Sequence, residues 1–96
     1  SDKFLRVVET VDLPAVLAQL PRCRHICTTG GKATEVLLSL LPDAPKMPKT
    51  GETLPFTLAD RHLTLTRLPS TSRAYPLSLQ KKAAAYRAFF EMAGLV

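Results

Sequence analysis

The sequence predicts a single α/β domain, layered α/β/α, in which helices cover a small and mainly parallel sheet. The chain has 96 residues and 46% of them are hydrophobic, which suits one domain with its own core. Segments with helical periodicity and segments with strand periodicity alternate along the chain. A Gly-Gly pair joins one strand to the next helix, as is common in sheets covered by helices.

The first clear element is a helix that follows Asp12. Residues 3–9 before it are either a short strand or an irregular lead-in. Asp12 can accept backbone N–H bonds at the helix start, and Pro14 is tolerated in the first turn. Pro21 ends the helix. Its apolar residues recur at helical spacing and form one stripe, namely Leu13, Val16, Leu17 and Leu20.

A buried strand and a second helix come next. The run "HICTT" favours β structure, and Gly30-Gly31 form a tight turn after it. The following residues repeat the helical stripe until Pro42. These stripe residues are Ala33, Val36, Leu37 and Leu40. The order helix, strand, glycine turn, helix is typical of an α/β sheet.

A proline-containing loop over residues 42–51 leads into a predicted hairpin. "TLPFTL" and "HLTLTRL" both alternate between apolar and polar residues, and "ADR" separates them. Pro55 would confine the first strand to a sheet edge. The last helix is capped by Ser78 and stopped by Gly94. Its predicted apolar face consists of Leu79, Ala83, Tyr86, Phe90 and Ala93.

Composition limits the classes of function. The net charge of +5 favours a polyanionic partner mildly, although the cations are scattered along the sequence and a solvated surface explains them equally well. The two cysteines, Cys23 and Cys27, are too few for a disulfide framework or a zinc site. We therefore expect free thiols, no metal and no cofactor. Without a membrane-length apolar stretch or signal peptide, the predicted location is cytoplasmic, with no membrane partner.

The stretch "TTGGKAT" is the first candidate site. It is not a nucleotide-binding P-loop, because Ile26 stands where that motif needs its first glycine and Ala33 replaces the Ser/Thr. A strand–Gly-Gly–helix turn nevertheless presents backbone N–H groups and the positive end of a helix dipole to an anion. Gly30, Gly31 and Lys32 are therefore candidate phosphate contacts. A plain strand-to-helix turn is the alternative.

The stretch "LPSTSRAYP" is the second candidate. Its hydroxyl residues, Ser70, Thr71 and Ser72, can bond to phosphate oxygens without reading sequence. Arg73 can pair with a phosphate or enter a groove, and Tyr75 can stack on a base. Pro69 stiffens the loop and so reduces the entropy lost on binding. A Ser/Thr-rich connection that caps the last helix is the alternative.

Topology relates the two candidates. Ligands of open α/β sheets bind at the carboxyl ends of parallel strands. If "HICTT" and "HLTLTRL" run parallel, Gly30–Lys32 and Ser70–Arg73 lie at one edge of the sheet. Two such loops suit a nucleic-acid backbone better than one small anion. No Ser/His/Asp, Cys/His or paired-carboxylate arrangement is recognisable, so the residues themselves indicate binding and no catalytic centre.

"HICTTGGKATEVLLSLL" and "HLTLTRLPSTSRAYPLSLQKKAAAYRAFF" together resemble the C-terminal half of the uracil-DNA glycosylase superfamily. The similarity is greatest to the branch of mismatch-specific thymine/uracil and hypoxanthine glycosylases. It runs from about Asp12 to Gly94, with "LPSTSRA" as its most specific part. The resemblance implies a partial uracil-DNA glycosylase-like fold. It also implies base excision repair, in which the partner is duplex DNA with a damaged or mismatched base.

The resemblance also implies residue roles. Pro69, Ser70 and Ser72 match the family's motif, whose loop presses on the DNA backbone in the minor groove. Gly30 and Gly31 match its phosphate-contacting turn. Leu68 occupies a position where several branches carry a base-contacting His or Asn, so base contact there would be apolar. Either Arg73 or Tyr75 would fill the gap left by the flipped base.

One departure from the family leaves the activity open. The family's water-positioning loop and its base-stacking aromatic belong to the N-terminal half and have no counterpart here. We therefore expect residues 1–96 to be a single domain that forms the C-terminal part of a longer glycosylase domain, with no catalytic residue in this chain. The alternative is a non-catalytic module that binds nucleic acid or protein. An exposed sheet edge could support a homodimer.

Overall fold

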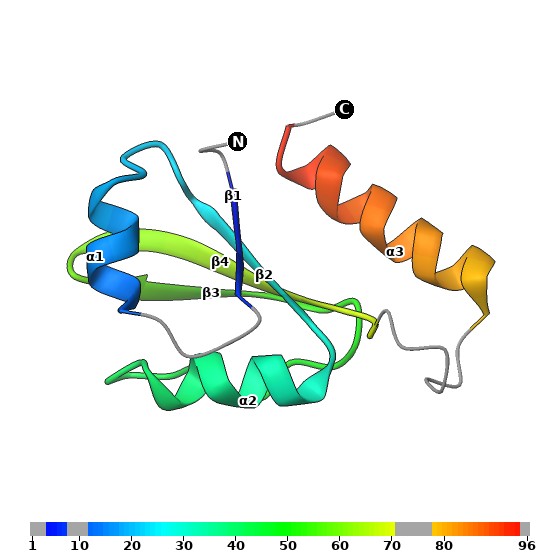
Figure 1. The fold of residues 1–96 in the computed structure, drawn as a ribbon, viewed down its shortest axis with the longest axis horizontal. Coiled ribbons are helices and arrows are strands. Elements are labelled where there is room, and N and C mark those ends of the chain that lie inside the picture. Colours follow the sequence, from blue (N-terminus) through cyan, green and yellow to red (C-terminus); the bar gives the residue numbers. More distant parts are fainter. Residues whose placement is uncertain (1–3, 8–11, 71–77, 95–96) are drawn as a thin grey trace.

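The computed structural model describes residues 4–7, 12–70 and 78–94, which form strands and helices in alternation (Figure 1). The elements in chain order are β1 (Phe4–Val7), α1 (Leu13–Ala18), β2 (His25–Thr29), α2 (Gly31–Ser39), β3 (Thr53–Leu58), β4 (Arg61–Leu68) and α3 (Leu79–Met92). The first segment, for which the sequence left two interpretations, is thus a strand.

The four strands form one sheet in the order β1-β2-β4-β3. β1 pairs with β2 and β2 pairs with β4 in parallel, whereas β3 runs antiparallel to β4. The predicted small, mainly parallel sheet is therefore present, with one strand more than the three that the sequence made clear. β3 lies at an edge, as Pro55 requires, because proline cannot donate a ladder hydrogen bond.

Helices α1 and α2 cover one face of the sheet. Leu17 of α1 and Leu37 of α2 are buried against Ile26 and Leu65, in the larger hydrophobic core. The predicted stripe of α1 faces this core through Leu13, Leu17 and Leu20, whereas the prediction for α2 was only partly right. Of its stripe only Leu37 belongs to this core, and Leu38 and Leu41, which the prediction omitted, pack there as well. Asp12 accepts a hydrogen bond from the backbone N–H of Ala15 at 3.2 Å, which confirms its predicted role as the cap of α1.

Helix α3 covers the other face, where Cys27 and Leu68 form a smaller core with Phe89 and Ala93 (Figure 1). The predicted apolar face of α3 was partly wrong. Leu79 is 82% exposed, whereas Phe89, which the prediction omitted, is 2% exposed. Tyr86, Phe90 and Ala93 of the predicted face do pack in this core. Leu79 and Ala83 are exposed because only the C-terminal turns of α3 pack on the sheet.

A two-residue turn connects β3 and β4. Ala59 and Asp60 both have positive φ, 51° and 65°, as the twist of a tight hairpin demands. The next residue, Arg61, donates to the carbonyl oxygens of Leu17, Leu20 and Cys23 at 2.6–2.9 Å. Its guanidinium thereby ties the C-terminal end of α1 to the start of β4.

Within the described part of the chain, no helix has the length and apolar character needed to cross a membrane.

Candidate functional site

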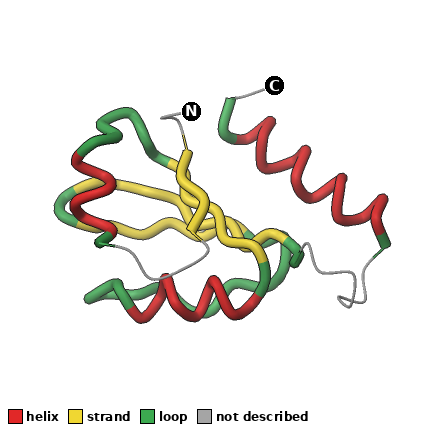
Figure 2. The backbone as a smooth tube through the Cα atoms, viewed as in Figure 1, coloured by secondary structure: helices red, strands yellow, loops and turns green. Residues whose placement is uncertain are grey.

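The two predicted loops meet at one edge of the sheet. β2 and β4 are parallel and in register, with Thr29 opposite Leu68. The backbone N–H of Gly30 donates to the Leu68 carbonyl at 2.9 Å, and a Cβ placed on Gly30 would lie 3.3 Å from the Cβ of Ser70. Figure 2 shows β2 and β4 ending together. The predicted juxtaposition is confirmed for Gly30 and Ser70. We use the name glycine edge for the residues that surround this contact at the carboxyl ends of β2 and β4. They are Gly30, Gly31, Lys32, Arg67 and Ser70.

Gly30 has a backbone conformation that other residues avoid. Its φ of 87° and ψ of 165° fall in a region populated almost only by glycine. A buried hydroxyl pair fixes this conformation, since Thr34 Oγ1 donates to the Gly30 carbonyl at 2.8 Å. The Thr28 hydroxyl lies 2.7 Å from that of Thr34 and supplies the second proton. The turn is therefore held rigidly before any ligand binds.

Gly31 makes room for an arginine. A Cβ on Gly31 would lie 2.9 Å from Nη2 of Arg67, closer than such atoms approach. Arg67 is the penultimate residue of strand β4. Its guanidinium thus lies against the start of α2. The two positions therefore require glycine for different physical reasons. Gly30 is needed for its positive φ and for the close approach of Ser70, and Gly31 is needed for the close approach of Arg67.

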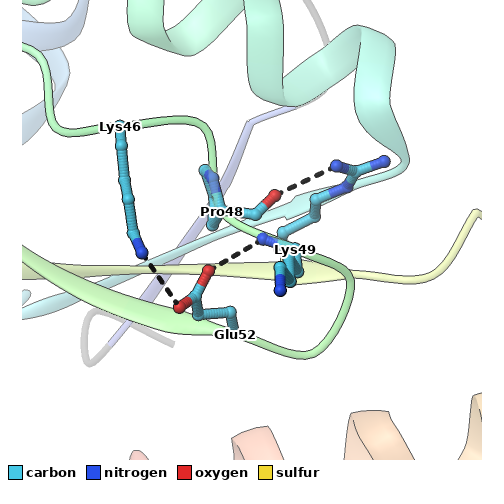
Figure 3. Close-up of polar contacts among 5 residues, drawn as sticks. Lys46, Pro48, Lys49 and Glu52 are labelled. Carbon is cyan, nitrogen blue, oxygen red and sulfur yellow. Dashed lines mark hydrogen bonds and ion pairs between the residues drawn. The ribbon is translucent and has the colours of Figure 1, made fainter.

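A loop before β3 holds Arg67 from its other side (Figure 3). The Pro48 carbonyl accepts a hydrogen bond from Nη1 of Arg67 at 3.0 Å. Glu52 faces Lys46 and Lys49 instead, accepting from the Lys49 N–H at 2.9 Å and lying 3.7 Å from Lys46 Nζ. The Lys49 hydrogen bond, helped by nearby lysine charges, lowers the pKa of Glu52. This carboxylate therefore stays ionised, and its ion pair among the described residues is with Lys46 and not with Arg67.

The start of the second loop is anchored by α3. The hydroxyl of Tyr86 donates to the Pro69 carbonyl at 3.0 Å, and Pro69 itself is fully buried. Burial raises the pKa of Tyr86, which keeps the phenol protonated as a donor. Tyr86 was predicted as part of an apolar face, but it also fixes the backbone that leads to Ser70.

Leu68 belongs to the core. It is 1% exposed and packs with Cys27 and Phe89, which leaves its side chain out of reach of a ligand in the described conformation. The other predicted contacts of the second loop, Thr71, Ser72, Arg73 and Tyr75, lie outside the described residues.

The glycine edge is electropositive. Lys32 is exposed in the first turn of α2, and this turn carries no acidic residue. Among the described residues, neither Lys32 nor Arg67 forms an ion pair with a carboxylate. The Nε of Arg67 is buried and lacks a hydrogen-bond partner there. Two uncompensated cations beside a helix N-terminus can attract and hold an anion.

Among the described residues, no group of three or more His, Cys, Asp or Glu side chains is placed to hold a metal ion.

Sequence reasoning missed the roles of Arg67 and of the Thr28–Thr34 pair. A signal for Arg67 was present, because the alternation along β4 places it on the same face as Leu63 and Leu65, toward α2. Thr34 follows Gly30 by four residues, so a helix brings its hydroxyl back to the Gly30 carbonyl. The hydrogen bond of Tyr86 had no such local signal.

Comparison of the chain with protein-family models, with curated proteins and with solved structures finds no match.

Proposed function

We propose that the glycine edge binds the phosphate backbone of DNA, as part of a DNA glycosylase-like protein. The observation that supports this most directly is the meeting of Gly30 with Ser70, where a Cβ would lie 3.3 Å from the serine Cβ. The N–H of Gly30 is already bonded to the Leu68 carbonyl, so the backbone donors for a ligand would come from Gly31 and Lys32 in the first turn of α2, beside the Ser70 loop. Lys32 and Arg67 add positive charge beside them.

The chemistry suits phosphodiesters better than bases. Hydroxyls, backbone amides and cations at a helix N-terminus all contact phosphate oxygens and carry no sequence information by themselves. Sequence resemblance to uracil-DNA glycosylases extends this proposal. The loop that follows Ser70 would press on a distorted duplex, and a flipped base would be hydrolysed by groups that the family carries in its N-terminal half.

Binding is tested with Lys32→Gln, because Lys32 is exposed and its loss should leave the fold intact. Fluorescence anisotropy with a labelled duplex should give a log–log salt slope of about −2 to −3 for the parent chain, as expected for two or three phosphate contacts. Lys32→Gln should reduce this slope by about one. Arg22→Gln is the matched control, since it removes the same charge from an exposed turn after α1.

Equal slopes for Lys32→Gln and Arg22→Gln would contradict a specific role for the glycine edge. The same preparations are then incubated with duplexes that contain uracil, a thymine mismatch or hypoxanthine, and treated with alkali. We expect binding without strand scission above an enzyme-free control, because no water-positioning residue is recognisable in this chain. That pattern would equally fit a non-catalytic DNA-binding module on the same scaffold.

A homodimer through a sheet edge stays a prediction. The two edge strands of the sheet are β1 and β3. Pro55, which lacks a backbone donor, makes β3 the poorer template for strand pairing. Sedimentation at several protein concentrations would detect such a dimer.

A further inference from the structure

The opposite edge of the sheet carries a second basic feature. At the amino ends of β2 and β4, a hollow of about 290 Å³ is lined by Pro21, Cys23, Arg24, Arg61 and His62. The length of β4 separates it from the glycine edge, about 23 Å at the rise of a strand. It is therefore a different site from the one assigned to DNA.

No carboxylate of the described residues balances the positive charge of the arginines in this hollow. Two of its five lining residues are arginines, and none is acidic. No ion pair of the described residues involves Arg24, Arg61 or His62. The positive charge reaches neighbouring groups too, since burial and then the charge of Arg24 lower the pKa of His25. An anion entering the hollow would meet two positive charges, one on Arg61, which hydrogen bonds hold in place, and one on exposed Arg24.

Arg61 is held in place by the protein backbone before any ligand binds. Its three hydrogen bonds to the Leu17, Leu20 and Cys23 carbonyls hold the guanidinium in place. A guanidinium has five N–H donors, so two remain after these three bonds. A cation that is held in advance loses little freedom on binding. Arg24 and His62 are exposed and can close on the ligand from the rim.

We propose that this hollow binds the phosphate group of a small phosphomonoester. A monoester carries about −1.5 to −2 charges at neutral pH, which matches two arginines, whereas a phosphodiester carries one. The volume is close to the lower end of the range for small-molecule sites and accommodates the phosphate with part of its substituent. Exposed Pro21 supplies apolar surface for that substituent.

The test compares ligands that differ in the charge of the phosphate, in the presence of phosphate or in the presence of a substituent. Adenosine 5′-monophosphate, its 3′,5′-cyclic diester, adenosine and inorganic phosphate are titrated into the ¹⁵N-labelled protein. We expect saturable amide shifts at Cys23, Arg24, Arg61 and His62 with the monophosphate and with inorganic phosphate. The cyclic diester should bind about ten-fold more weakly than the monophosphate, and adenosine should give no saturable shift.

Arg24→Gln should weaken monophosphate binding about ten-fold, while Arg22→Gln, two residues away and outside the lining, should leave it unchanged. His62→Gln serves as a second rim variant, because it leaves the bonds of Arg61 intact. Equal affinity for the monoester and the cyclic diester would overturn the proposal, as would equal effects of Arg22→Gln and Arg24→Gln. Absence of saturable shifts at these residues would also overturn it. None of these outcomes depends on DNA binding at the glycine edge.

Discussion

Replacing Gly30 with alanine should destabilise the protein through two effects that the structure separates. An L residue at φ 87° and ψ 165° is strained by about 1–3 kcal/mol. The new Cβ would also lie 3.3 Å from the Ser70 Cβ, so the second loop must yield by a few tenths of an ångström. For a domain of this size, the strain alone corresponds to a fall in Tm of about 4–24 °C.

Two further glycine variants separate strain from crowding. Gly51 has a φ of 86° and no atom within 4 Å of its Cβ position, so Gly51→Ala introduces strain without a new contact. Gly31→Ala introduces a contact with the end of the Arg67 side chain, 2.9 Å away, without an unfavourable φ. Since a side-chain end can move, we expect Gly31→Ala to stay within about 1 kcal/mol of the parent chain.

The assay is thermal and urea unfolding followed by circular dichroism, with duplex binding measured on the same preparations. Gly30→Ala should be the least stable of the three variants and should bind DNA more weakly, because the two loops are pushed apart. If Gly30→Ala is no less stable than Gly51→Ala, the close approach of Gly30 and Ser70 is wrong. If it unfolds earlier but binds DNA unchanged below its Tm, the glycine edge is not the DNA contact.

Three other predictions concern buried polar groups. Burial raises the pKa of Cys27 from 9.0 to about 11, so the thiol of the unfolded chain loses its proton at lower pH than the thiol of the folded chain. The free energy of unfolding should therefore fall by about 2 kcal/mol as pH rises from 9 to 11. Urea unfolding of Cys27→Ala should show a shallower fall over this pH range, and an identical fall would contradict the shift. Arg61→Met should cost about 2–4 kcal/mol by leaving three carbonyls without their donor, whereas Arg22→Met, at an exposed turn, should change stability by less than about 0.5 kcal/mol. Thr34→Val should cost about 1–2 kcal/mol, since it removes the bonds to Thr28 and Gly30; a loss no greater than that of exposed Thr57→Val would show that the hydroxyl pair does not hold the turn.

The sequence by itself determined the elements whose signals are local. Apolar spacing placed α1 and α2, since a period of 3.6 defines one buried stripe, and it identified Leu13, Leu17 and Leu37 as core residues. Asp12 and Ser78 both cap helices as predicted, with hydrogen bonds to the backbone N–H groups of Ala15 and Lys81 at 3.2 Å. Pro55 marked an edge strand because it lacks a donor. Such features depend on residues within one turn or one strand, so neighbouring residues suffice to predict them.

Only the tertiary structure decided which distant groups meet. Strand register placed Gly30 beside Ser70, and it also brought Arg61 to carbonyls that lie 38 to 44 residues earlier in the chain. The buried residues of α3 depended on which part of that helix lies on the sheet, so Phe89 near its C-terminal end is buried and Leu79 at its N-terminal end is exposed. The alternation along β4 indicated which face of the sheet Arg67 lies on, but its hydrogen-bond partner, the Pro48 carbonyl, is 19 residues away in the sequence. Its guanidinium acquires a position only when β4, α2 and the loop at Pro48 pack together, because long side chains are fixed by the surfaces they contact and not by their own sequence.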